Sequence, residues 1–277
     1  MAIVAQSSKL SNVLWPVLAW IVGLLFFFPI FWMVLTSFKT DADAVKSEYL
    51  LWFTPTLENY LNMTENYDYW RFARNSVITS VFATIFTLVV SIPAAYAMAF
   101  NPTKRTKDVL MWMLSTKMLP AAAVLYPMTF LTKSLGLFDT HFMIILVLSL
   151  INLPIVIWML FTYFKEIPKD IIEAGKMDGV DTLGEIKEIL IPLAWGGIAS
   201  TALLCFIFCW NEAYWTVRLT TTDAATLSKL IEGNRAPEGL FFGRLSAVST
   251  AAVGPIVVLG WFCQKQLVQG LTFGAVK

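Results

Sequence analysis

FMIILVLSLINLPIVIWMLFTYF, residues 142–164, contains no charged side chain and is long enough to form a membrane-spanning helix. A helix of about 20 apolar residues can cross the hydrocarbon core because it satisfies its own backbone hydrogen bonds. Five further apolar runs flank this stretch, so the sequence predicts an all-α membrane protein with six transmembrane helices. The expected spans are residues 14–38, 76–100, 109–131, 142–164, 195–210 with its flanks, and 245–262.

The composition agrees with a membrane protein. Apolar residues make up 57% of the chain and charged residues only 14%, whereas soluble domains carry about 25% charged residues. The net charge of +1 gives no reason to expect a nucleic-acid partner. His141, the single histidine, is expected at the membrane interface, and Cys205 and Cys209 are expected to be free thiols. No group of residues has metal-ligand spacing, so no metal site is predicted.

A short basic turn between the second and third spans orients the chain. Lys104, Arg105 and Lys107 lie within this turn, and the positive-inside rule places such turns in the cytoplasm. With six spans, both termini and the polar segment 165–192 are then cytoplasmic. The longer loops 39–74 and 211–244 are expected outside. The first span is expected to be retained, because no signal-peptide cleavage site closes it.

Prolines interrupt several of the expected spans. Each removes a helical hydrogen bond and tends to kink the helix. Such a kink either lines a transport pathway or is purely structural, and the sequence leaves both readings open. These prolines are Pro93, Pro120, Pro154 and Pro255.

The polar segment 165–192 separates the fourth and fifth spans. Pro168 can begin a short helix, and Asp178-Gly179 is a turn signal that ends it. Thr182-Leu183-Gly184-Glu185 has the form of a capping box, which makes Thr182 the expected N-cap of a second helix. Pro192 marks the entry to the fifth span. The sequence therefore predicts two short helices that meet at a bend and face a soluble partner.

The first of these two helices is expected to carry a face of small side chains. Ile171, Ala174 and Gly175 follow i, i+3, i+4 spacing and would share one face. Glu173 projects beside this face, with Lys176 near. A partner's backbone could therefore approach closely.

The same segment resembles the EAA loop of binding-protein-dependent ABC importer permeases. Gly175 stands where that family usually has alanine. The resemblance continues through Asn75-Ser76, residues 93–97 and Trp210-Asn211-Glu212. Residues 270–277 are similar to the C-terminus of maltose-type smaller permeases, and the chain as a whole looks most like sorbitol/mannitol permeases. The residues that match the loop are Glu173, Ala174, Asp178, Gly179, Ile189, Ile191 and Pro192.

The resemblance implies that residues 1–277 form a single transmembrane domain of a sugar or polyol importer in a bacterial inner membrane. Such a chain would have no catalytic residues and no cofactor of its own. It contains no G-x4-G-K-[ST] run, so ATP and Mg would be bound by two copies of a separate ATPase subunit. A second homologous permease subunit would complete a heterodimer. An extracytoplasmic sugar-binding protein would deliver the substrate and contact loop 211–244.

The resemblance also implies which residues couple the permease to the ATPase. Glu173 would pair with a basic residue of the ATPase, and Gly179 would make the bend. The C-terminal tail would reach between the two ATPase subunits. The complete set is Glu173, Ala174, Gly175, Asp178, Gly179, Pro192, Gly274 and Lys277.

Four polar residues are candidates for the translocation path: Lys117, Asn152, Asn211 and Glu212. A lysine at membrane depth costs about 2.5–3.5 kcal/mol on insertion scales, so it should face water or a partner. Lys117 could line the path, anchor a helix contact or snorkel to the interface. Asn152 could bind a polyhydroxy substrate or another helix. The alternative function is an ion-coupled secondary transporter or channel acting alone, which would favour an internal inverted repeat, and none is evident.

Overall fold

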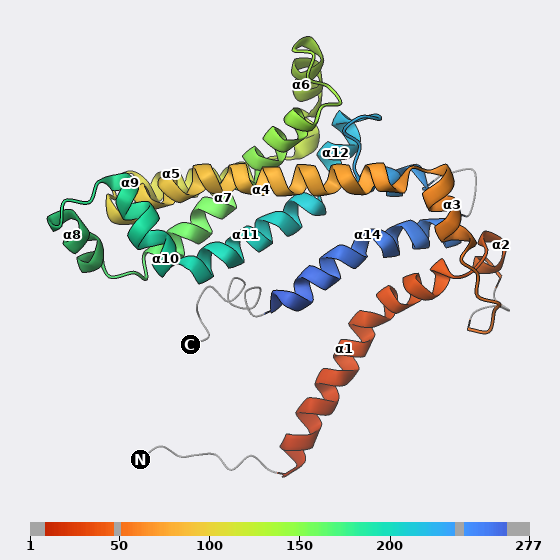
Figure 1. Cartoon of the computed structure of the whole chain (residues 1–277). Coiled ribbons are helices and arrows are strands. Elements are labelled where there is room, and N and C mark those ends of the chain that lie inside the picture. The colour runs from red at the N-terminus through yellow and green to blue at the C-terminus, as the bar shows by residue number, and fades with distance from the viewer. Residues whose placement is uncertain (1–8, 47–50, 236–240, 265–277) are drawn as a thin grey trace. The chain divides into compact units, whose positions relative to one another are not determined.

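The computed structural model describes residues 9–46, 51–235 and 241–264, in which the regular elements are helices (Figure 1). The described residues form two compact units. One lies within residues 1–67 and 233–253, and the other within residues 68–232 and 254–277.

Four helices are long and apolar enough to cross a membrane: α1 (Lys9–Ser37), α4 (Tyr69–Phe100), α7 (His141–Phe164) and α14 (Phe242–Phe262). Two further pairs of helices qualify together but are sharply bent. α5 (Thr106–Thr116) meets α6 (Ala121–Ser134) at 85°, and residues 182–193 meet α11 (Trp195–Trp210) at 86°. The described residues therefore contain four to six membrane spans, depending on whether each bent pair is one span.

The expected third span, residues 109–131, is wrong as a single helix. α5 ends at Thr116 and α6 begins at Ala121, with Pro120 as its N-cap in an extended conformation. Proline lacks an N–H donor and disfavours helical geometry in the residue before it, so Pro120 separates the two helices. Pro93 and Pro154, in contrast, lie inside the continuous helices α4 and α7.

Helices α4, α7 and α11 form the core of the second unit, where they run along one another (Figure 1). The buried face of α4 consists largely of small and hydroxyl-bearing side chains, which let membrane helices approach closely. The buried threonine hydroxyls of this face donate to carbonyl groups of α4 itself: Thr84, for example, donates to the carbonyl of Ser80 at 2.7 Å. Across the interface, Ser149 of α7 donates to the carbonyl of Ala83 at 3.2 Å. The buried small residues of α4 include Ser76, Thr79, Ser80, Ala83, Thr84, Thr87, Ser91 and Ala95.

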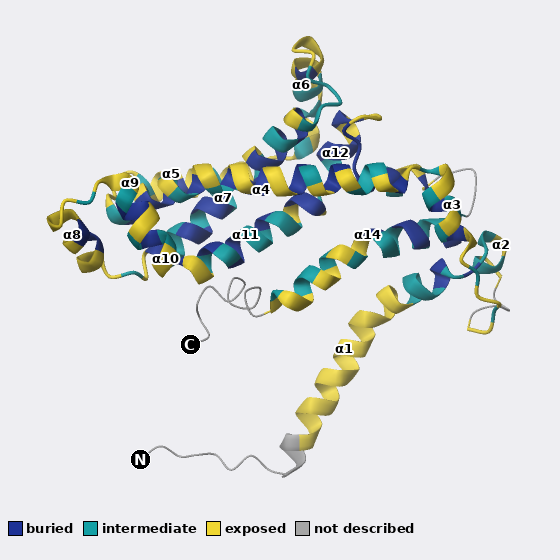
Figure 2. Cartoon of the chain, viewed as in Figure 1, coloured by how far each residue is buried: buried dark blue, intermediate teal, exposed yellow. Residues whose placement is uncertain are grey.

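Helix α1 exposes apolar side chains along most of its length (Figure 2). Trp20 is 73% exposed and Phe26 is 75% exposed. Such an exposed apolar surface is expected where a helix contacts lipid or another membrane subunit.

The first unit is held together by contacts around the end of α1, with α2 (Asp41–Ala44) and α3 (Glu58–Asn66). Asn59 donates to the carbonyls of Ser37 and Lys39 at 3.0 and 2.7 Å. A Cβ atom at Gly243, near the start of α14, would lie 2.6 Å from the Lys39 carbonyl oxygen, so only glycine fits there. Lys39 is 2% exposed, and this burial lowers the pKa of its ammonium group.

In the second unit, the loop between α12 (Tyr214–Leu219) and α13 (Leu227–Gly233) is fastened to the residues before α7. The Asp139 carboxylate accepts hydrogen bonds from the Thr221 hydroxyl at 2.5 Å and from three consecutive backbone N–H groups, those of residues 222–224, at 2.8–3.1 Å. Burial alone would raise the pKa of Asp139, but these hydrogen bonds outweigh it and hold the pKa below its ordinary value. Asn75 of α4 donates to two carbonyls of the same loop and lies 3.0 Å from His141 Nε2.

Candidate functional site

The polar segment 165–192 folds into two helical arms, as the sequence predicts. The first arm is α8 (Lys169–Met177), which follows Pro168. The second arm is a run of helical residues from 182 to 193 (Figure 1). It comprises α9 (Thr182–Gly184), a π-helical turn η2 (Glu185–Leu190) and α10 (Ile191–Leu193).

Gly179 makes the bend between the arms. Its φ of 81° lies in the left-handed region that favours glycine. The N–H of Val180 donates to the carbonyl of Gly175, and the N–H of Gly179 donates to that of Lys176, at 3.0 and 3.1 Å. These two bonds form a Schellman motif, which satisfies the last carbonyl groups of α8. Gly179 therefore has the local geometry that the resemblance implies for it.

Gly175 lies between the arms, because α8 packs against η2. Gly175 and Ile172 are buried. A Cβ atom at Gly175 would lie 2.5 Å from Ile189 Cδ1. The expected face of Ile171, Ala174 and Gly175 is therefore divided: Gly175 faces the second arm, while Ile171 and Ala174 are exposed. Helical spacing shows which residues of α8 share a face, but it does not show which face the second arm of the same chain buries.

The outer side of α8 is an exposed surface of mixed chemistry. Glu173 and Ala174 are exposed, as are Lys176 and Asp178 near the bend. Met177 is 88% exposed and lies among these charged side chains. This combination of an apolar centre with charged neighbours is typical of a protein-binding surface.

The second arm begins one residue earlier than the capping box predicts. Asp181, not Thr182, is the N-cap, and its carboxylate accepts a hydrogen bond from the N–H of Gly184 at 3.0 Å. Glu185 is consequently not part of a cap. It is 1% exposed and accepts a hydrogen bond from the hydroxyl of Tyr96 in α4.

Pro192 lies in α10, just before the chain turns into α11. The turn falls at Ala194, which is the residue between the two helices. α11 then packs closely on α7: a Cβ atom at Gly197 would lie 2.7 Å from the Tyr163 ring. Pro192 therefore stands at the entry to the fifth span, where the sequence places it.

Three of the four candidate pathway residues come together at the break between α5 and α6. Lys117 is the C-cap of α5, and its Nζ lies 3.4 Å from Asn152 Oδ1. Asn152 is 2% exposed and also donates to the carbonyl of Leu148. Lys117 and Glu212 both line a cavity of about 490 Å³. Lys117 is thus at a helix break rather than inside a continuous span.

The remaining predicted site residues do not join these groups. Asn211 is exposed, and its side chain donates to the carbonyl of Ile207 in its own helix at 2.9 Å. Gly274 and Lys277 lie outside the described residues.

Two features of the site were not anticipated from the sequence. The Tyr96–Glu185 contact joins residues 89 positions apart, and no local pattern pairs them. The second is the buried face of small residues on α4. The sequence does carry a signal for this face, because its serines, threonines and alanines recur every three to four residues.

Apolar helices with two sharp breaks, a polar two-armed segment, and a cavity lined by Lys117 and Glu212 among apolar side chains are the features of a multi-pass membrane protein. Residues 91–271 match the family described as "Binding-protein-dependent transport system inner membrane component". The chain belongs to this family and is an ABC transporter permease.

Individual relatives are similar over their whole length. The chain is 30% identical, over 100% of both sequences, to "Probable ABC transporter permease protein y4oR" of Sinorhizobium fredii. It is also 30% identical to "Trehalose transport system permease protein SugB" of Mycobacterium tuberculosis, over 95% of this chain and 97% of that one. "Trehalose/maltose transport system permease protein MalG" of Thermococcus litoralis is 30% identical over 98% and 99%.

A solved structure shares the fold. It is a chain of a bacterial ABC transporter involved in the import of the acidic polysaccharide alginate, with a TM-score of 0.76. The match covers 96% of this chain and 100% of that chain at 22% identity. The all-helical permease fold is therefore shared at low sequence identity.

Proposed function

We propose that this chain is a permease subunit of an ATP-driven importer for a carbohydrate. The observation that carries the proposal is the two-armed segment 165–192, in a chain that belongs to the binding-protein-dependent permease family. The relatives named for trehalose and for trehalose/maltose support a carbohydrate as the substrate class. We keep sorbitol or mannitol as the substrate to test first, on the sequence resemblance alone.

The outer side of α8 is the proposed docking surface for the ATPase subunit. Its exposed Glu173 offers a carboxylate for a basic residue of the ATPase, and Ala174 beside it leaves room for close approach. The bend at Gly179 and the packing of Gly175 against Ile189 hold α8 on the second arm. ATPase movement would then reach the membrane helices through that arm.

The proposed assembly places both termini and the two arms in the cytoplasm of a bacterium. Loops 39–74 and 211–244 would be outside. A second homologous permease would complete a heterodimer, two ATPase copies would bind ATP and Mg, and a sugar-binding protein would deliver the substrate. The cavity beside Lys117 and Glu212 is the proposed part of the translocation path in this chain.

Purification of the full chain from membranes in mild detergent tests this proposal. Co-purification of an ATPase, a second permease and a sugar-binding protein is expected, and the ligand of that binding protein identifies the substrate. Recovery of the chain alone, with uptake independent of ATP, would instead favour a lone transporter.

A charge reversal tests the docking surface. Glu173→Lys should remove the ATPase from the purified complex and abolish uptake, with membrane insertion unchanged. Glu65→Lys, at an exposed acidic position of α3, is the matched control and should retain the ATPase. Normal uptake and ATPase retention by Glu173→Lys would exclude this surface.

A further inference from the structure

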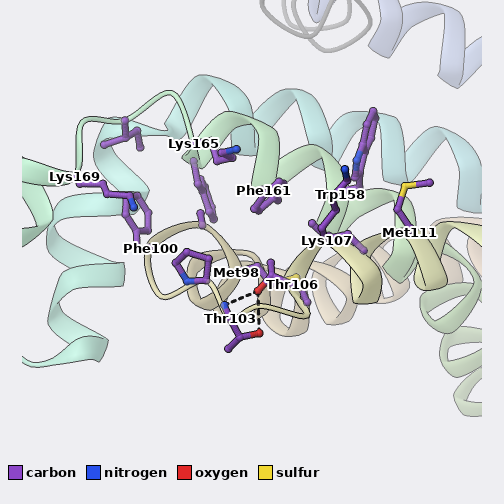
Figure 3. Close-up of a pocket in the computed structure, with 15 residues that line it drawn as sticks. Met98, Phe100, Thr103, Thr106, Lys107, Met111, Trp158, Phe161, Lys165 and Lys169 are labelled. Carbon is purple, nitrogen blue, oxygen red and sulfur yellow. Dashed lines mark hydrogen bonds between the residues drawn. The ribbon is translucent and has the colours of Figure 1, made fainter.

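A second cavity, of about 600 Å³, lies where several helices end on one side of the second unit (Figure 3). Its walls come from the end of α4, the start of α5 and the end of α7, together with the first residue of α8. It shares no lining residue with the cavity beside Lys117. The candidate site described above makes no use of it.

The interior of this cavity is apolar and aromatic. Trp158 and Phe161 of α7 form one wall, and Met98, Phe100 and Leu110 contribute from α4 and α5. Two of the three wall helices, α4 and α7, are apolar enough to span a membrane, and α5 qualifies together with α6. An occupant of this cavity therefore needs a hydrocarbon part.

Three lysines lie around the cavity, and no acidic residue is among the described residues that line it. Lys107 comes from α5, Lys165 follows α7, and Lys169 begins α8, so the charges approach from three directions (Figure 3). All three side chains are exposed. Lys165 Nζ lies 5.4 Å from the Phe161 ring, which positions a cation directly beside the apolar wall.

The N-terminal end of α5 also lies at the cavity, through Thr106 and Lys107. Arg105 is the N-cap of this helix, and Asp108 is the one acidic residue of its first turn. The hydroxyl of Thr106 accepts a hydrogen bond from the N–H of Thr103 at 2.8 Å and orders the turn (Figure 3). The N-terminal end of a helix favours anions because its N–H groups and dipole point toward them.

We propose that this cavity binds an anionic phospholipid of the surrounding membrane. The acyl chains would lie against Trp158 and Phe161, and the phosphate would contact Lys107, Lys165 and Lys169. Basic pockets at the ends of membrane helices suit anionic head groups, and each basic residue near the surface contributes to binding. Because Lys169 begins α8, a bound lipid would also touch the base of the first arm.

The cavity combines cationic side chains with apolar walls, and this combination suits a lipid rather than a soluble anion. Three lysines alone would suit free phosphate, but the aromatic and aliphatic walls would stay exposed to water. A protein partner with an acidic, apolar segment is the competing occupant, and it would displace the lipid when the complex assembles.

The test measures lipid binding to the purified, delipidated full chain by native mass spectrometry. Dioleoylphosphatidylglycerol is expected to bind more tightly than dioleoylphosphatidylcholine. The triple variant K107Q/K165Q/K169Q should weaken phosphatidylglycerol binding on the order of 100-fold, and K165Q alone about fivefold. Lys133→Gln is the matched control: its Nζ also lies beside an aromatic ring, 5.0 Å from that of Phe138, but it does not line this cavity.

Several results would overturn the proposal. Equal binding of the two lipids would remove the anionic requirement. Unchanged phosphatidylglycerol binding in the triple variant, or equal loss in Lys133→Gln, would place the lipid elsewhere. Displacement by excess glycerol 3-phosphate would indicate a site for free anions. Loss of the lipid when the chain is assembled with its ATPase and partner permease would assign the cavity to a protein.

Discussion

Tyr96 donates a buried hydrogen bond to Glu185, and this contact joins α4 to the second arm of the polar segment. Tyr96 is 2% exposed and Glu185 is 1% exposed. Glu185 begins the π-helical turn η2, and Tyr96 lies near the end of α4. Movement of the second arm must therefore either pull on α4 or break this bond.

Tyr96→Phe should destabilise the chain and impair coupling. The buried Glu185 carboxylate loses its donor, which costs at least about 1–3 kcal/mol. The expected result is a lower Tm of the purified chain and less substrate uptake per ATP hydrolysed. Tyr126→Phe, at a side chain that is 81% exposed, is the control. In Tyr96→Phe/Glu185→Met, much of the Tm should return; equal Tm in Tyr96→Phe and wild type would show that the bond contributes nothing.

Gly179→Ala should weaken the bend between the arms. An L-residue in the left-handed conformation costs roughly 1–2 kcal/mol, and the φ of 81° requires that conformation. Uptake is expected to fall, and protease cleavage between the arms to rise, with insertion unchanged. Gly196→Ala is the control, since a Cβ atom there meets nothing within 4 Å and the residue is helical. A cleavage rate like that of the control would contradict a structural role for Gly179.

Gly175→Ala should be tolerated. The added Cβ atom meets Ile189 Cδ1, the end of a flexible side chain that can rotate away. Uptake and Tm are expected to stay close to those of the wild type. Gly243→Ala is the contrast, because its Cβ atom meets the fixed carbonyl oxygen of Lys39 at 2.6 Å. A large loss of Tm in Gly175→Ala would mean that the arms pack too rigidly to adjust.

Lys117→Met should alter transport without unfolding the chain. The lysine lines the cavity it shares with Glu212, and its hydrogen bond to Asn152 is long at 3.4 Å. Tm is therefore expected to change little, while the KM for uptake rises several-fold. Lys133→Met, at an exposed lysine of α6, should leave both unchanged. An unchanged KM and rate in Lys117→Met would remove this residue from the pathway.

Asp139→Asn should release the loop at residues 220–226. It should also remove part of the dependence of Tm on pH. The pKa of Asp139 is lowered in the folded chain, so its ionised form stabilises the fold above the unfolded pKa of about 3.9. This contribution is lost as the pH falls toward the folded pKa. Wild-type Tm should therefore decline more steeply than that of the variant from about pH 5 to about pH 3. Parallel pH profiles would refute this assignment.

The sequence by itself determined the class of the protein and the outline of its polar segment. Long uncharged runs such as residues 142–164 form helices in a bilayer, because a helix satisfies its own backbone hydrogen bonds. The bend at Gly179 was also readable, since Asp-Gly is a local turn signal that acts within a few residues.

Only the tertiary structure decided how these elements pack. Pro120 broke the third span completely, whereas Pro93 and Pro154 stayed inside their helices. Glu185 fits the pattern of a helix cap, yet it became a buried partner of Tyr96. Periodicity says which residues share a face, but burial depends on which distant helix covers that face, and residues far apart in the chain decide this.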